Sequence, residues 1–386
     1  MKKEIQKVPT IRFKGFTDDW EQRKLSALTS IFNSGKGIQS AEIKKVGLYP
    51  VYGGNGVRGY ADRYNYDGEF ALIGRQGALC GNMNYYMGKA YFTEHAIVVK
   101  ASDNSNTRFL YYMLDTLKLG HYSDQSAQPG LAVNKLIRLT SAVPKLEEQK
   151  HIAEYLTNLD NLITLHKRKL KQLQTLKKYF LQNMFPAKKE KVPAIRFKGF
   201  TDDWEQRKLG DFLTISKIPG HTGINAKKLT VKLWGKGIVE KKDIYSGSEN
   251  TQYYIRHTGQ FMYGKLDFLH AAFGIVPKNL DKFESTLDSP AFDLNGIDSQ
   301  FLLNKVIQKD FYLKQGLVAN GSRKAKRIHE NTFMAMPIII SSLEEQKKIG
   351  KYFVVLNDLI TLHHRKCDQL QSLKKFMLQN LFIQRR

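Results

Sequence analysis

The chain has 386 residues, and 61 Lys and Arg against 36 Asp and Glu give it a formal net charge of +25 at pH 7. This surplus is spread along the whole chain and predicts a polyanionic partner such as nucleic acid. Two cysteines are too few for a disulfide framework. The sequence has neither a run of about 18 apolar residues nor the apolar core of a signal peptide, so we expect a soluble, cytoplasmic protein.

The strongest signal is an internal repeat. Residues 8–26 return as residues 192–210 with 17 of 19 positions identical, and residues 146–185 return as 343–382 with 25 of 40 identical. The blocks between them, residues 27–143 and 211–340, resemble each other only faintly. The simplest interpretation is that the repeated segments, residues 8–26 with 146–185 and residues 192–210 with 343–382, form a duplicated frame that has the same function in both copies. The two blocks between them would then have two different functions.

The first half predicts a mixed α/β block followed by one long helix. Residues 49–74 are rich in Gly, Tyr and short alternating runs, which predicts strands joined by tight turns, and residues 106–120 predict a helix. Residues 146–185 predict a helix of about 36 residues and about 54 Å. Its apolar positions recur at spacings of four and three, as in a coiled coil: Ile152, Leu156, Leu159, Ile163, His166, Leu170 and Leu173.

The second half repeats this order after a charged linker, residues 187–194, that carries Pro193, so the first helix should stop near Phe185. Residues 298–316 predict one helix near the end of the second block. The apolar stripe returns at Ile349, Phe353, Leu356, Ile360, His363, Cys367, Leu370, Met377 and Leu381. One apolar seam on each helix predicts that the two helices pair with each other.

The predicted fold class is therefore α+β: two mixed α/β domains joined and spaced by two long antiparallel coiled-coil helices, with a pseudo-twofold internal repeat. The predicted domains are residues 1–143 (variable part 27–143), helix 144–185, residues 186–340 (variable part 211–340) and helix 341–386. For His166 and His363, packing in the seam is favoured over a role as metal ligands or pH sensors. Trp20 and Trp204 are predicted packing anchors.

Several catalytic patterns are absent from the sequence. None of the four Gly-Lys pairs has the Walker spacing of a P-loop, and the prolines include no Pro-Pro pair, which removes the Asn-Pro-Pro or Asp-Pro-Pro element of amino-methyltransferases. No His/Cys cluster has zinc spacing. No group of carboxylates suggests a two-metal nuclease. The sequence thus predicts no active site and no metal.

The doubled frame, with LEEQK at the start of each long helix and KGFTDDWEQRKL before each variable block, resembles the specificity subunit of type I restriction–modification systems. The resemblance covers nearly the whole chain. It implies a non-catalytic subunit in which residues 27–143 and 211–340 are target recognition domains, each binding half of a bipartite asymmetric site in double-stranded DNA. It also implies that the paired helices set the spacer and dock two methyltransferase (modification) subunits, which two restriction (endonuclease/translocase) subunits join. S-adenosylmethionine, ATP and Mg²⁺ would then belong to those partners, which methylate adenine and restrict DNA.

Candidate DNA contacts lie in both variable blocks. Arg75 and Gln76, between glycines, suit guanine and adenine respectively, with a structural turn as the alternative. Lys265 is the counterpart in the second block, and Arg58 is a further candidate in a glycine-rich turn. A basic run in residues 321–327 predicts phosphate clamping or guanine readout, with a solvated loop as the alternative; its candidates are Arg323, Lys324, Lys326 and Arg327.

Two other functions stay open at this point. One is a stand-alone DNA nuclease or methyltransferase whose site the sequence patterns do not reveal. The other is a helical adaptor that binds proteins, for which the positive charge would be incidental.

Overall fold

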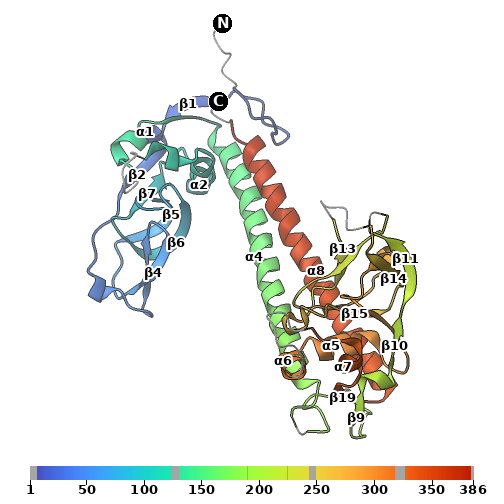
Figure 1. The fold of residues 1–386 in the computed structure, drawn as a ribbon. Coiled ribbons are helices and arrows are strands. Elements are labelled where there is room, and N and C mark those ends of the chain that lie inside the picture. The colour runs from blue at the N-terminus through green and yellow to red at the C-terminus, as the bar shows by residue number, and fades with distance from the viewer. Residues whose placement is uncertain are drawn as a thin grey trace. The chain divides into compact units, whose positions relative to one another are not determined.

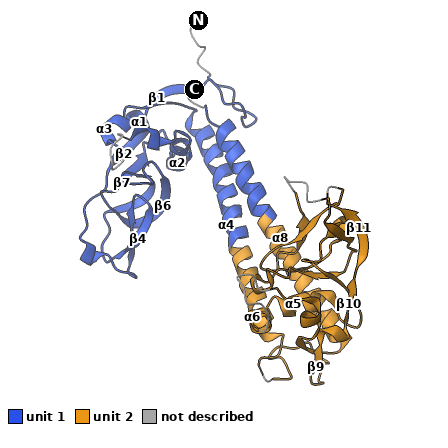
Figure 2. Cartoon of the chain, in the orientation of Figure 1, with its two compact units in different colours: residues 1–167, 365–386 blue, residues 168–364 orange. Residues whose placement is uncertain are grey.

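The computed structural model describes residues 7–123, 130–188, 190–223, 225–242, 249–317 and 327–383. The chain forms two compact units (Figure 2): unit 1 is residues 1–167 and 365–386, and unit 2 is residues 168–364. Two helices of 38 residues, α4 (Leu146–Asn183) and α8 (Leu343–Asn380), each pass from one unit into the other. Each unit therefore contains one half of each long helix.

Unit 1 is built on a six-stranded sheet in the order β2-β7-β5-β6-β3-β4. All neighbours are antiparallel except β3 and β6. The central strand β5 is buried on both faces: Ala71 and Ile73 face the core under α2, and Phe70 and Leu72 face a second cluster. Figure 1 shows α2 beside this sheet. The sheet strands are β2 (Thr29–Ser34), β3 (Tyr49–Gly53), β4 (Gly56–Ala61), β5 (Tyr66–Gly74), β6 (Met83–Phe92) and β7 (Ala96–Ala101).

The remaining elements of unit 1 connect this sheet to the long helices. A small two-stranded sheet joins β1 (Glu21–Lys24) to β8 (Thr140–Val143), which precedes α4 directly. The predicted strands and tight turns of residues 49–74 are confirmed by β3, β4 and β5. The short helices are α1 (Leu25–Leu28), η1 (Ser40–Glu42), α2 (Thr107–Thr116), η2 (Leu119–Tyr122) and α3 (Val133–Leu136).

Unit 2 divides its strands among smaller sheets. A four-stranded sheet has the order β10-β18-β15-β16, a three-stranded sheet the order β11-β14-β17, and β12-β13 and β9-β19 are two-stranded. Its strands are β9 (Glu205–Lys208), β10 (Leu213–Ser216), β11 (Ile218–Thr222), β12 (Leu229–Val231), β13 (Ile238–Glu240), β14 (Gln252–Ile255), β15 (Phe261–Tyr263), β16 (Phe273–Ile275), β17 (Glu284–Ser285), β18 (Ala291–Leu294) and β19 (Pro337–Ile340).

The prediction of a single helix over residues 298–316 is wrong. The segment forms α5 (Ser299–Val306) and α6 (Lys309–Gly316), because the backbone of Gln308 is extended, with φ −75° and ψ 139°, and interrupts the helical hydrogen bonds. The other helical turns of unit 2 are η3 (Leu209–Asp211), η4 (Phe268–His270), η5 (Lys278–Leu280) and α7 (Glu330–Met334).

The long helices pack against each other in both units. In unit 1, Lys374 Nζ of α8 lies 2.6 Å from Asp160 Oδ1 of α4. In unit 2, the rings of Phe180 on α4 and Tyr352 on α8 are 5.1 Å apart. Higher numbers on one helix thus lie opposite lower numbers on the other, so the α+β fold with two long antiparallel helices is confirmed. At 1.5 Å per residue, each helix is about 57 Å long.

The predicted apolar stripe faces the interior. Ten of its members are less than 9% exposed: Ile152, Leu156, Leu159, Ile163, Leu173, Ile349, Phe353, Leu356, Cys367 and Leu381; Met377 is 9% exposed. His166, Leu170, Ile360, His363 and Leu370 are half-buried. Within the described residues, no helix combines the length and apolar character needed to cross a membrane.

Candidate nucleic-acid interface

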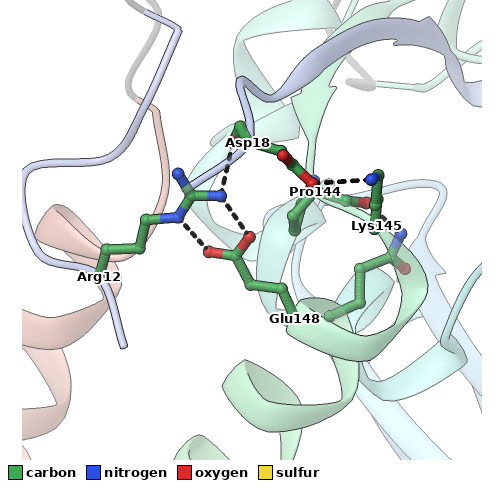
Figure 3. A network of polar contacts seen from close by, with 6 residues as sticks. Arg12, Asp18, Pro144, Lys145 and Glu148 are labelled. Atoms are coloured by element: carbon green, nitrogen blue, oxygen red, sulfur yellow. Dashed lines mark hydrogen bonds and ion pairs between the residues drawn. The ribbon is translucent and has the colours of Figure 1, made fainter. Parts of the chain in front are cut away.

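A buried ion pair fastens the N-terminal repeat of unit 1 to the start of α4 (Figure 3). Arg12 donates from Nε and Nη2 to the two carboxylate oxygens of Glu148, both at 2.8 Å, and Nη2 also donates to the backbone oxygen of Asp18. The Glu148 side chain is 2% exposed. The planar guanidinium fork matches a carboxylate in two bonds at once, which fixes orientation as well as charge.

Unit 2 repeats this contact with the equivalent residues. Arg196 donates to both oxygens of Glu345 at 2.8 and 2.9 Å and to the backbone oxygen of Asp202. Both glutamates lie in the first turn of a long helix, where the helix dipole also favours negative charge. The residues that the two copies of the repeat share therefore make the same contact in both units.

The same repeat also binds the end of the other long helix. The backbone N–H of Ile11 donates to Asn380 O at the end of α8, and that of Ile195 donates to Asn183 O at the end of α4. Trp20 and Trp204 lie buried in the two cores beside these contacts. Each repeat thus joins the beginning of one helix to the end of the other, which specifies their antiparallel register.

Three predicted DNA-binding residues lie on segments that pack together at one edge of unit 1. The turn of residues 53–56 packs directly on the end of β5: a Cβ on Gly54 would lie 2.8 Å from His95 O and 3.4 Å from Gly74 Cα. Only glycine permits so close a backbone approach. This packing places the turn that precedes Arg58 against the backbone of Gly74 and Arg75, at the end of β5.

Side chains and backbone hold that edge in place. Gln76 Oε1 lies 2.9 Å from His95 Nδ1, and Arg75 Nη1 donates to Glu94 O at 3.4 Å. The N–H of Leu131 donates to Arg75 O, which ties the segment to the chain beyond residue 130. Arg58 and Gln76 are exposed and Arg75 is half-buried. The edge offers cations and amide groups of the kind that contact phosphates and base edges.

The counterpart predicted in unit 2 lies in a different environment. Lys265 is buried, and its Nζ lies 2.8 Å from Glu330 Oε1, so a contact with DNA would have to break this ion pair. Arg327 is exposed and lies 3.5 Å from Asp288. Arg323, Lys324 and Lys326 lie outside the described residues.

Sequence reasoning missed a tryptophan and an arginine of unit 2. Trp234 is 55% exposed in the loop between β12 and β13. The sequence signal was the Gly-Lys-Gly run of residues 235–237, which follows Trp234 directly and predicts an exposed turn. Arg256 is fully buried, where it donates to Ser285 Oγ and Ser216 O, and burial lowers its pKa to about 10. Its contacts join separate strands, which indicates a structural role.

The long helices expose apolar side chains at the same repeat positions in both units. In unit 1 these are Leu162, Leu165, Leu373 and Phe376, and in unit 2 they are Leu359, Leu362, Leu176 and Tyr179, all 39–59% exposed. Across the described ranges, no group of three or more His, Cys, Asp or Glu residues could hold a metal ion.

Comparisons with known proteins identify related chains. Residues 17–175 match the family described as type I restriction modification DNA specificity domain. The type I restriction enzyme EcoprrI specificity subunit of Escherichia coli is 49% identical over 115 residues, which cover 30% of this chain and 29% of that protein. The putative MjaX specificity subunit of Methanocaldococcus jannaschii is 23% identical over 333 residues, 78% of this chain and 74% of that protein.

Similarity to the E. coli subunit and to a putative Haemophilus influenzae subunit spans only 29% and 38% of the lengths of those relatives. Among solved structures, the S subunit of a type I restriction–modification system from M. genitalium has a TM-score of 0.69 and 14% identity, covering 97% of this chain and 99% of that one. At this identity the match supports the fold alone. These findings agree with the resemblance seen in the sequence: the chain is similar to type I restriction–modification specificity subunits, and its residues 17–175 match the model of their DNA specificity domain.

Proposed function

We propose that this chain is the non-catalytic DNA specificity subunit of a type I restriction–modification complex. In this proposal residues 27–143 and 211–340 each bind one half of a bipartite asymmetric DNA site, within the domain boundaries 1–143, 144–185, 186–340 and 341–386. Modification subunits methylate adenine and restriction subunits cleave, with S-adenosylmethionine, ATP and Mg²⁺ bound to those partners in the cytoplasm. The observation that carries the proposal is one frame, with the same buried ion pair, built twice around two unlike sheets.

The two sheets support separate reading of two half-sites. In unit 1, Arg58, Arg75 and Gln76 lie on segments that pack together, and we propose that they contact bases and phosphates of the first half-site. Arg323, Lys324, Lys326 and Arg327 remain the proposed cationic contacts of the second block. A contact between Lys265 and DNA is proposed only on the condition that the DNA displaces Glu330 from its ion pair with Lys265.

The helices support the proposed spacer. Half-sites on one face of B-DNA lie about 34–36 Å apart for each helical turn. A helix of 38 residues is about 57 Å long, which is enough to span that separation. The buried and half-buried seam positions that recur along both helices favour a stiff element over a flexible linker.

The exposed apolar positions support docking of two copies of one partner. Leu162, Leu165, Leu373 and Phe376 of unit 1 have the same repeat positions as Leu359, Leu362, Leu176 and Tyr179 of unit 2. Two matching surfaces can each bind one copy of the same partner, which agrees with the proposed pair of modification subunits. A contiguous exposed apolar patch marks an interaction site, and residues three apart on a helix, such as Leu162 and Leu165, are neighbours on its surface.

Reconstitution with the modification subunits tests the proposal. The complex, but not the chain alone, should methylate plasmid DNA in the presence of S-adenosylmethionine, and single-molecule sequencing should reveal a two-part motif. Methylation or cleavage by the chain alone would support a stand-alone enzyme instead. Negligible DNA affinity of the complex at every salt concentration would support a protein-binding adaptor.

A further inference from the structure

Trp234 is the exposed tryptophan of unit 2. The chain has three tryptophans. Trp20 and Trp204 are 4% and 2% exposed, whereas Trp234 is 55% exposed in the loop that joins β12 to β13. Tryptophan is enriched at binding surfaces, where its large apolar ring and its polar N–H can both make contacts.

The loop holds this ring in a strained but ordered backbone. Trp234 has a φ of +62°, in the left-handed region that side chains with a Cβ rarely adopt, and Ala271 opposite it has a φ of +49°. The N–H of Trp234 donates to His270 O at 2.7 Å, and the N–H of Gly235 donates to Ala271 O at 2.8 Å. The His270 ring lies edge-on, with centroids 5.5 Å apart. Backbone strain retained in an ordered loop is common at functional sites.

Two exposed lysines stand two positions before and two positions after Trp234 in the sequence, and one of them lines a positively charged groove. These lysines are Lys232 and Lys236. Lys236 also lines a groove of about 950 Å³, together with Lys177 and Lys178 of α4 and Lys309 of α6; Asp310 is the acidic residue of that lining. Four ammonium groups against one carboxylate give the groove a net positive charge, which attracts a polyanion rather than an apolar or cationic partner.

The β12–β13 loop of unit 2 also occupies a place equivalent to that of the β3–β4 turn at the candidate edge of unit 1. In unit 1 the β3–β4 turn packs on the segment between β5 and β6, which carries Arg75. In unit 2 the β12–β13 loop is hydrogen-bonded to residues 270 and 271, which lie between β15 and β16. A hairpin turn therefore meets the loop after a central strand in both units, with Arg58 next to that turn in one and Trp234 on it in the other.

We propose that Trp234 contacts the bases of the DNA half-site bound by unit 2, while Lys232 and Lys236 contact the adjacent phosphates. This inference rests on the proposed function. In duplex DNA an aromatic ring can pack on the thymine methyl group in the major groove, and lysines bind phosphates without regard to sequence. The proposal assigns base readout in unit 2 to an aromatic side chain, where unit 1 offers Arg75 and Gln76.

The test uses reconstituted complexes with the wild-type chain, Trp234→Ala, Trp234→Phe and, as a matched control, Met87→Ala, which removes another highly exposed apolar side chain, on β6. Binding is measured on the methylated-motif duplex and on a duplex whose second half-site is scrambled. We expect Trp234→Ala to weaken binding to the first duplex about tenfold, because base–aromatic contacts have about that effect. Trp234→Phe should weaken it less, and Met87→Ala not at all.

Fluorescence gives a second readout that survives a folding defect in the alanine variant. The wild-type and Trp234→Phe complexes differ only in this indole, so their difference spectrum belongs to Trp234. The motif duplex should change that spectrum, and the scrambled duplex should change it less. An unchanged spectrum, or unchanged affinity of a folded Trp234→Ala complex, overturns this inference alone. Failure of the wild-type complex to prefer the motif duplex overturns the proposed function instead.

Discussion

Units 1 and 2 share their helix contacts and differ in their sheets. Arg12–Glu148 and Arg196–Glu345 are the same ion pair, and Asn106 and Asp298 cap their helices by accepting from the N–H three residues later. The six-stranded sheet of unit 1, in contrast, corresponds to two smaller sheets and a hairpin in unit 2. The two halves of this chain therefore share their sequence where a domain contacts the long helices, and they differ in sequence elsewhere.

A polar contact of the helix pair also differs between the units. In unit 1, Asp160 accepts from Tyr112 and forms an ion pair with Lys374. The equivalent positions in unit 2 are Asn304, Asn357 and Lys177, so the carboxylate is missing there. Burial lowers the pKa of Lys177. The frame is therefore not uniform, and this position distinguishes its two halves.

The largest effect is expected from the shared ion pair. Arg12→Met leaves the buried carboxylate of Glu148 without its partner, which should lower the free energy of unfolding by about 3 kcal/mol. Arg196→Met should have the same effect through Glu345. Chemical denaturation measures both, with Arg23→Met, at the exposed pair with Glu21, as the control. A small effect of Arg12→Met beside a large effect of Arg196→Met would break the equivalence of the two frames.

The next effect concerns the unlike sheets. Arg75→Ala should weaken binding of the complex to its motif duplex by about 2 kcal/mol and relax the motif in one half-site only, because a bidentate arginine is lost. Methylation mapping and titration measure the two effects. Relaxation of both half-sites, or a uniform loss on every sequence, would contradict base readout by Arg75.

A smaller effect is expected at the position that distinguishes the helix halves. Asp160→Asn should destabilise the chain by about 1 kcal/mol, because Tyr112 and Lys374 lose a charged acceptor. Asn357→Asp should have the opposite sign, since it offers Lys177 a partner. If both substitutions lowered the free energy of unfolding equally, the carboxylate at position 160 would not account for the difference between the two helix halves.

The same position predicts a pH dependence. Because the pKa of Lys177 is lowered in the folded state, the unfolded state binds more protons between that pKa and the ordinary value of 10.5. The free energy of unfolding should therefore rise with pH in that window. Asn357→Asp should flatten the rise in denaturation curves recorded across it, and an unchanged slope would exclude Lys177 as its source.

The smallest effect is expected at the exposed pair of Lys145 and Asp18, whose counterpart in the second repeat has Ser342 in place of the lysine. Lys145→Ser makes unit 1 like unit 2 and should leave the denaturation midpoint unchanged, because water screens such pairs. A clear shift of the midpoint would mean that the two frames differ in stability at their surfaces.

The sequence predicted the frame because it is written twice and has a clear coiled-coil period. The pairing of Arg12 with Glu148 was not predicted, since the two residues are far apart in the chain, although both lie in repeated motifs. The variable blocks occur once each, so no internal comparison guided their interpretation. Lys265 was a candidate by its place after Gly264, and only the fold brings Glu330 to it. Trp234 was missed because most tryptophans lie in cores.

The central claim is that two structurally different domains, each of which recognises its own bases, are attached to one duplicated frame. Exchange of residues 27–143 for the corresponding block of a related chain, followed by single-molecule mapping of methylated DNA, measures this most directly. We predict a new sequence in one half of the motif, with the other half and the spacer unchanged. A change in both halves, or in neither, would contradict the claim.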